Sequence, residues 1–246
     1  GAIFVNNGNL SLSNSVISNN SASDKGGGLY ALNSDVEIIN SSITNNTSTT
    51  GGGIYSDNST FEINNSDISN NSASFGDGAG IYAIASNLSI DSTIFSNHSE
   101  FTKGGAIYYH PQAQNEHSYI FNVSNSIFDN NEYANFNQGY SAGGAIWMQW
   151  TQNAHFINNV FTNNLANQGA ALYIQSSSPI YIENCTFADN YCIGQGPAIY
   201  FNGYSNNENI FDIKNSIFYD NDGANQPIYT VQVQPMISYT LIDEYY

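Results

Sequence analysis

The sequence predicts an all-β fold, a single-stranded parallel β-helix of about nine rungs with three strands in each. Three observations predict it. Glycine-led blocks recur mostly every 25–27 residues, each repeat holds three short segments of alternating apolar and polar residues, and no segment has helical periodicity. Such a repeat cannot bury its apolar face alone, so successive copies must stack. At about 4.8 Å per rung, nine rungs give a rod roughly 40 Å long.

Each rung begins at a block of small residues. The blocks start near Gly1, Gly26, Gly51, Gly78, Gly104, Gly143, Gly169, Gly196 and Pro227. Residues 1–246 therefore read as one β-helix domain. The chain opens at a rung boundary and its last segment, 237–246, loses the repeat pattern, so we expect either a longer parent chain or a rod end that docks on another copy.

The first strand of each rung places an aliphatic residue beside an aromatic one, and only one of the two can point inward. The residue after the aromatic is mostly apolar, as at Ala31 and Ile174, and shares the aliphatic face. We therefore expect the aromatic column outside. It comprises Phe4, Tyr30, Tyr55, Tyr82, Tyr108, Trp147, Tyr173, Tyr200 and Tyr229. Tyrosine suits any pleated surface, but a continuous exposed stripe usually marks a contact surface, for sugars or for a second rod.

The second strand carries apolar pairs such as Phe61 and Ile63, and the third strand carries one Ile or Phe. The third-strand column comprises Ile17, Ile43, Ile68, Phe128, Phe161, Phe187 and Phe218. Asparagines stand three residues before and after this column, as at Asn65 and Asn71. We expect them to form the corners and to hydrogen-bond from rung to rung. The rung at 78–103 fits two registers, which predicts a bulge there.

Composition excludes several classes of protein. The formal net charge is −17, with three Lys or Arg residues against 20 carboxylates, so binding to nucleic acid or to anionic lipid is disfavoured. No apolar run is long enough for a membrane span. Two cysteines do not make a disulfide scaffold. Cys185 and Cys192 share one rung, as small buried residues or as a disulfide within it.

The glycine blocks and the third strands together resemble a known repeat. Gly104-Gly105-Ala106-Ile107 and Gly143-Gly144-Ala145-Ile146, paired with Phe128-x-x-Asn131, Phe161-x-x-Asn164, Phe187-x-x-Asn190 and Phe218-x-x-Asn221, resemble the GGAI and FxxN repeats of the chlamydial polymorphic outer membrane proteins. Looser versions cover nearly the whole chain. The resemblance implies a right-handed β-helix of the pectate-lyase-like kind and a secreted or surface-displayed adhesive role. It implies no catalytic residues.

Carboxylates supply the weak candidates for catalysis. Asp189 and Asp220 occupy the same turn position in neighbouring rungs, and Asp222 is close by. Stacked about 5 Å apart, they could act as acid and base or bind calcium. The favoured interpretation is that they replace asparagines of the same column, such as Asn70. Otherwise we expect no cofactor.

The rung from Gly104 is the most specialised, because it holds two insertions, at 110–118 and 132–141. Loops on a rigid scaffold commonly carry function, and the aromatic residues Tyr109, Tyr133, Phe136, Tyr140, Trp147 and Trp150 lie in or near these loops. They either bind a ligand or fix their own loops. The histidines, such as His110 and His117, show no metal-ligand spacing, so a solvated loop is expected.

Asn-x-Ser/Thr sequons are more frequent than the seven or so expected from composition. The twelve are Asn9, Asn19, Asn40, Asn45, Asn46, Asn58, Asn64, Asn70, Asn87, Asn97, Asn122 and Asn184. Asn19, Asn45 and Asn70 share one outward turn position. In a eukaryotic protein they predict a row of glycans; in a bacterial one they are polar turns.

These observations favour a non-enzymatic, extracellular or cell-surface β-helix, either a filament element or an adhesin. Its expected partners are further copies along the rod or surface glycans. The alternative is a carbohydrate-active enzyme of the same fold, a polysaccharide lyase or a glycoside hydrolase, which an activity screen with and without calcium would reveal.

Overall fold

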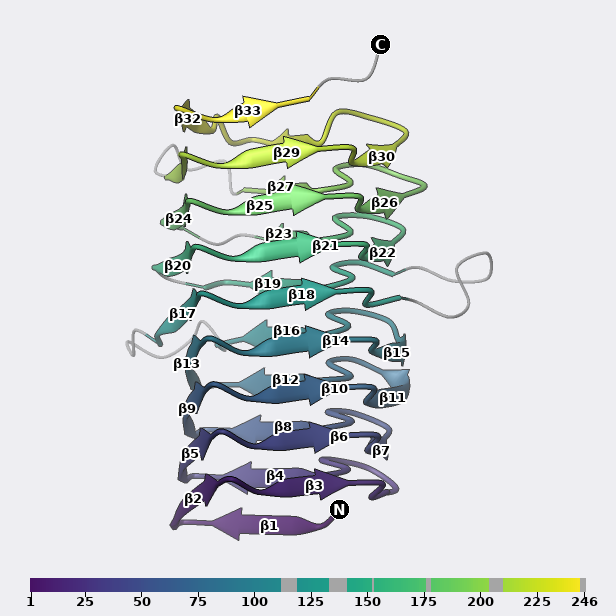
Figure 1. The fold of residues 1–246 in the computed structure, drawn as a ribbon, viewed down its shortest axis with the longest axis vertical. Helices are drawn as coiled ribbons and strands as arrows, with labels where there is room; N and C mark the ends of the chain where they lie inside the picture. The colour runs from purple at the N-terminus through teal and green to yellow at the C-terminus, as the bar shows by residue number, and fades with distance from the viewer. Residues whose placement is uncertain (112–118, 133–140, 152, 176–177, 204–209, 244–246) are drawn as a thin grey trace.

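The computed structural model describes residues 1–111, 119–132, 141–151, 153–175, 178–203 and 210–243. The described residues form strands and turns, wound as a right-handed parallel β-helix that rises from β1 to β33 (Figure 1). None of them forms a helix long and apolar enough to cross a membrane. The predicted fold is confirmed.

Three nine-stranded parallel sheets run the length of the rod, one for each predicted strand of the repeat. Sheet 1 comprises β1 (Ile3–Asn6), β4 (Leu29–Leu32), β8 (Ile54–Asp57), β12 (Ile81–Ile84), β16 (Ile107–His110), β19 (Ile146–Gln149), β23 (Leu172–Gln175), β27 (Ile199–Asn202) and β31 (Ile228–Val231). Sheet 2 comprises β2 (Asn9–Ser13), β5 (Asp35–Ile39), β9 (Thr60–Asn64), β13 (Asn87–Asp91), β17 (Phe121–Ser124), β20 (Ala154–Ile157), β24 (Ile180–Glu183), β28 (Phe211–Lys214) and β32 (Met236–Ser238). Sheet 3 comprises β3 (Val16–Ser18), β6 (Ser42–Thr44), β10 (Asp67–Ser69), β14 (Ile94–Ser96), β18 (Ile127–Asp129), β21 (Val160–Thr162), β25 (Thr186–Ala188), β29 (Ile217–Tyr219) and β33 (Leu241–Ile242).

Two short sheets between sheet 3 and the next glycine block were not predicted. They comprise β7 (Thr47–Ser48), β11 (Ser72–Gly76) and β15 (Ser99–Phe101), and β22 (Leu165–Ala166), β26 (Tyr191–Cys192) and β30 (Asp222–Gly223). The bulge expected in the rung at 78–103 is wrong for its long strands, because β13 and β14 pair regularly with their neighbours and Phe95 takes the place of Ile68. A register shift does occur between β11 and β15, but the extra residues lie in β11, between Ser72 and Gly76.

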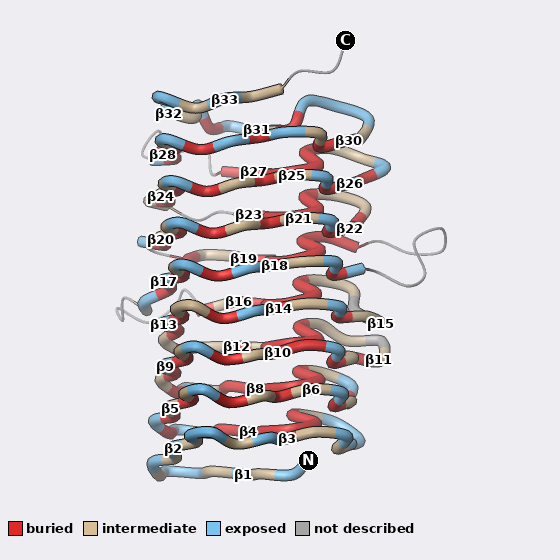
Figure 2. Tube along the Cα trace, viewed as in Figure 1, coloured by how far each residue is buried: buried red, intermediate tan, exposed pale blue. Residues whose placement is uncertain are grey.

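The core is a continuous column inside the rod. Buried positions recur at the same place in successive rungs (Figure 2). The aliphatic residues of sheet 1, such as Leu29 and Ile146, point inward and are fully buried. Two residues further on, Ala31 and Ile174 share that face, as predicted. Burying a large apolar side chain contributes about 1.5–3 kcal/mol, so several in each rung offset much of the ordering entropy.

Left-handed backbone turns the chain at the corners of each rung. In the third rung Gly51, Asn58, Asn65 and Asn70 have φ between 48° and 64°. Asparagine tolerates this region better than most residues. Glycine is needed at the fourth corner, because a Cβ on Gly51 would lie 2.5 Å from the carbonyl oxygen of Ile54.

The asparagines that follow sheet 3 form a buried hydrogen-bond ladder, as predicted. In the upper rungs the Nδ2 of each donates to the Oδ1 of the next, at 2.8 Å from Asn131 to Asn164 and 3.0 Å from Asn164 to Asn190. Each amide also donates to a backbone carbonyl, as Asn46 does to Ile17 at 2.9 Å. These side chains are buried and their amide groups are hydrogen-bonded, so the column links each rung to the next.

Candidate functional site

The aromatic column lies on the outer face of sheet 1, as predicted, but its middle is not exposed. Tyr55, Tyr108, Trp147, Tyr173 and Tyr200 are buried, with Trp147 only 2% exposed. The rings stack on one another, at 4.5 Å between the Tyr82 and Tyr108 centroids and again between Tyr108 and Trp147. The expected exposed stripe is therefore wrong.

Residues from the turn before each glycine block cover the rings. The ammonium of Lys25 lies 4.5 Å from the ring centroid of Tyr55, and that of Lys103 lies 4.9 Å from the ring of Trp147. Ala142 packs in the same cluster as Trp147. Burial raises the pKa of Tyr82 to about 12, so its hydroxyl stays protonated at neutral pH.

The ends of the ladder are more open. Phe4 is 62% exposed, and Tyr30 and Tyr229 are partly exposed; between the ends, Tyr82 is the one ring that is partly exposed. Phe4 and Tyr30 tilt at 53° to each other and Tyr30 meets Tyr55 edge-on, whereas the rings from Tyr55 upward lie nearly parallel. A ligand would meet ring edges here, and stacked faces are closed to it.

The specialised rung from Gly104 is partly described. Tyr140, Tyr133, Phe136 and His117 lie outside the described residues. Trp150 is half-buried and its ring meets that of His110 edge-on at 4.8 Å. Tyr109 is part of the core, where its hydroxyl donates to the carbonyl oxygen of Ser86 at 2.8 Å and lies 3.2 Å from that of Ile120. The first insertion follows β16 and the second follows β18 in the chain.

The candidate carboxylates occupy a corner column. Asp189 and Asp220 adopt the left-handed backbone, with φ of 55° and 51°, that asparagine adopts in the rungs below. The amide of Asp189 donates to the carbonyl of Tyr219, which places the two carboxylates in register. Asp222 pairs with Tyr191 in the short sheet and lines a 300 Å³ pocket of residues 221–227. Among the described residues, no group of three His, Cys, Asp or Glu side chains could hold a metal ion.

His98 is a buried residue of the asparagine ladder that the sequence did not single out. It replaces asparagine between Asn71 and Asn131 and is 1% exposed. Its Nδ1 lies 3.1 Å from the backbone nitrogen of Asn71, which donates to it when the ring proton is on Nε2, and 3.3 Å from the Asn71 carbonyl oxygen. Its Nε2 has no hydrogen-bond partner among the described residues. Burial lowers the pKa of His98 to about 4. Its position three residues after Phe95, where the other rungs have an asparagine, was the signal in the sequence that could have identified it.

The two cysteines are buried free thiols. Burial raises the pKa of Cys185 to about 11 and that of Cys192 to about 12, so neither is a reactive thiolate. They fill small core positions, the first of the two expected alternatives.

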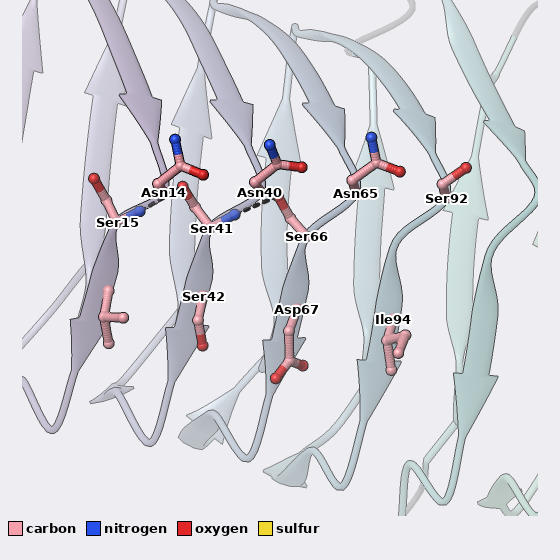
Figure 3. Close-up of a pocket in the computed structure, with 11 residues that line it drawn as sticks. Asn14, Ser15, Asn40, Ser41, Ser42, Asn65, Ser66, Asp67, Ser92 and Ile94 are labelled. Atoms are coloured by element: carbon pink, nitrogen blue, oxygen red, sulfur yellow. Dashed lines mark hydrogen bonds between the residues drawn. The ribbon is translucent and has the colours of Figure 1, made fainter.

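A polar groove of 610 Å³ follows the corner between sheets 2 and 3 in the first four rungs (Figure 3). The amides of Asn14, Asn40 and Asn65 stand one above the other and point the same way. Beneath them the backbone N–H groups of Ser15 and Ser41 each donate to the serine hydroxyl of the next rung, at 3.1 Å. The groove therefore presents a regular row of amide groups.

Apolar side chains flank this groove. Val16 is 71% exposed and Ile94 is 44% exposed, on the outer face of sheet 3. A second groove of 520 Å³ crosses sheet 2, where Glu37 and Glu62 lie in register and Ser11 donates to Glu37 at 2.8 Å.

The predicted sequons differ in exposure. Asn9, Asn19, Asn45, Asn58, Asn70, Asn97 and Asn122 are exposed, and Asn87 is partly exposed. Asn46 belongs to the buried ladder, so a glycan on it would break the fold.

Comparison with known families gives one match. Residues 14–32 and 40–57 match the Chlamydia polymorphic membrane protein (Chlamydia_PMP) repeat. Each matched segment runs from a corner asparagine through a strand of sheet 3 and a glycine turn to the end of a strand of sheet 1. No curated protein and no solved structure matches the chain. Two segments of the chain thus match this repeat, and the chain folds as a parallel β-solenoid.

Proposed function

We propose that this protein is a non-enzymatic rod of the cell surface or extracellular space, with an adhesive contact at the rung that begins at Gly104. The repeats and the β-helix fit a surface structural or adhesin-like protein. The proposal goes further in naming the contact region, and its expected partners are surface glycans or neighbouring copies.

One observation carries the proposal. The repeat is regular in most rungs, but the rung from Gly104 holds two insertions, after Pro111 and after Glu132, whereas the rung from Gly196 holds one shorter insertion. A rigid scaffold that concentrates its irregular sequence at one level presents that level to a partner. Trp150 and His110 form an aromatic pair beside the first insertion.

The enzyme alternative has less support. Asp189 and Asp220 occupy positions that the backbone geometry alone explains. The three lysines have other contacts, with Tyr55, with Trp147 and, for Lys214, with Asp212. The sequence contains no arginine. The carboxylates themselves could act as acid and base, but the lysines that could stabilise developing negative charge contact other residues.

The test measures binding of the purified chain to a glycan array and to cells. In one variant both segments 112–118 and 133–140 are replaced by short linkers; the matched control shortens 204–209 instead, in another rung. We expect the wild type and the control to bind, and the double replacement to lose binding while keeping its β-sheet circular dichroism. Unchanged binding by the double replacement would overturn the proposal. So would polysaccharide turnover that Asp220→Asn abolishes.

A further inference from the structure

One corner of the rod repeats the same backbone in eight rungs. The corner that follows sheet 3 has φ between 51° and 59° at Asn19, Asn45, Asn70, Asn97, Asn130, Asn163, Asp189 and Asp220. Backbone hydrogen bonds keep these residues in register, as between Asn45 and Ser69 and between Asn70 and Ser96. Left-handed geometry explains an Asn or Asp in all eight rungs.

The residue two positions after this corner differs in type between the rungs. It is a hydroxyl residue in the first four rungs and something else in the next four: Ser21, Thr47, Ser72 and Ser99, then Glu132, Leu165, Tyr191 and Asp222. The backbones of these residues form parallel β pairs from one rung to the next, from Ser21 through Ser99 and again from Glu132 through Asp222. The fold therefore accepts an acidic, an aliphatic or an aromatic side chain here and does not require a hydroxyl.

The corner amides also behave differently in the two sets. In the lower rungs the Nδ2 of Asn19 and that of Asn70 donate to the hydroxyl of the preceding serine, at 3.2 and 3.3 Å. Higher up, the Nδ2 of Asn130 donates across the rungs to Asn97 at 2.8 Å, and that of Asn163 to Asp129 at 2.9 Å. The amide nitrogens of Asn19, Asn70 and Asn97 thus donate within their own rung, and the oxygen of Asn97 accepts the bond from Asn130.

We propose that Asn19, Asn45, Asn70 and Asn97 are acceptors for N-linked glycans and form one row along this corner. The backbone geometry accounts for the asparagine, and the acceptor sequence Asn-x-Ser/Thr accounts for a hydroxyl residue two positions later in the same four rungs. With rungs about 4.8 Å apart, the row spans about 14 Å. The proposal also assigns the chain to a secretory pathway that makes N-linked glycans.

The glycan row and the adhesive contact of the Gly104 rung are separate. Eleven of the twelve sequons lie within residues 1–122, and the exception is Asn184. The same corner is free of sequons from Asn130 upward. Sugar would then cover the lower corner of the rod and leave that corner of the upper rungs bare.

Glycopeptide mapping of the protein purified from the cells that make it tests this directly. Treatment with peptide N-glycosidase in heavy-oxygen water converts each glycosylated Asn into labelled Asp. We expect label at the four row positions and none at Asn46, which is a sequon but is buried in the ladder. Asn130 and Asn163 are matched controls with the same backbone and no hydroxyl. Absence of label at all four row positions would overturn the proposal.

Variants secreted from a eukaryotic host test the role of the hydroxyl. Ser72→Ala should remove one glycan from the row, the one on Asn70. Glu132→Thr should add one at Asn130, because Glu132 is exposed and only the hydroxyl is missing. Each change is read as the loss or gain of one glycan in the intact mass. If Ser72→Ala leaves the mass of the glycan complement unchanged, the proposal fails; cell binding at the Gly104 rung is measured separately and tests the other proposal alone.

Discussion

The lower and upper parts of the rod fill the same core column with different residues. Ile17, Ile43 and Ile68 occupy it in the first three rungs, and Phe95, Phe128, Phe161, Phe187 and Phe218 occupy it in the next five. The phenylalanine rings stack at 4.7–4.9 Å along the axis. Register is unchanged across the boundary, since Ile68 pairs with Phe95. Backbone pairing therefore fixes the position of a core residue and leaves its size open.

The opposite wall follows the same trend. On sheet 1 the second inward residue is Ala31, Ser56 and Ala83 below, and Tyr109, Met148 and Phe201 are among those above. In the lower part Ser56 donates to Ser86 inside the rod at 2.8 Å. The upper rungs thus bury more apolar surface, and we expect them to be the more stable part.

The largest expected effect is on the core column. Phe161→Ala should lower the free energy of unfolding by about 3–5 kcal/mol, because it removes a buried ring stacked on two others. Ile43→Ala should cost about 2–5 kcal/mol and fall below Phe161→Ala in the same protein. Urea unfolding gives the totals, and hydrogen exchange localises the loss to the mutated rungs. An equal or greater loss from Ile43→Ala would contradict the comparison.

His98 stands at the boundary between the two parts and should make it acid-labile. The unfolded chain takes up this proton near pH 6.5, whereas the folded chain does so near pH 4. Between these values the unfolded state binds more protons, so stability falls with decreasing pH, by about 3 kcal/mol over the whole window. Protonation would also place an Nδ1 proton against the Asn71 amide that now donates to it.

His98→Asn restores the residue found elsewhere in the ladder and should remove this pH dependence. Unfolding free energies at pH 7 and pH 4.5 measure it. At pH 7 the variant should match the wild type or exceed it, because the buried Nε2 without a partner is gone. A wild type and a variant with the same pH slope would contradict the assignment.

Most of the fold follows from the period, and the exceptions have physical causes. The aliphatic and aromatic columns, the core strands and the asparagine ladder repeat at fixed spacing, so each is visible in the sequence. His98 occupies a ladder position where neighbouring rungs have asparagine, so the residue type hid it. It also lies in the rung at 78–103, for which the sequence allowed two registers. The covering of the aromatic ladder depends on Lys25 and Lys103, whose side chains reach over rings about a rung away. Reach of this kind leaves no periodic signal.

The smallest expected effect concerns that cover. Lys103→Ala should cost about 0.5–1 kcal/mol through the lost cation–π contact, and it should shift the fluorescence of Trp147 to longer wavelength as water reaches the ring. It should also raise the pKa of Asp77, which burial already raises and which the Lys103 charge lowers. Lys25→Ala in the lower part is the matched control, because Lys25 lies over the ring of Tyr55 and not over a tryptophan.

Lys103→Met separates the two contributions of this side chain. The methionine keeps an apolar stem over Trp147 and removes the charge. If cover matters most, Lys103→Met should keep the wild-type emission wavelength while Lys103→Ala shifts it. If the cation matters most, Lys103→Met and Lys103→Ala should lower the free energy of unfolding by the same amount. The lysine charge would then stabilise the stacked rings, in a chain that has three lysines in total. We expect the first outcome, because stacking on Tyr108 and Tyr173 already buries both faces of Trp147 and leaves the lysine stem to close its edge.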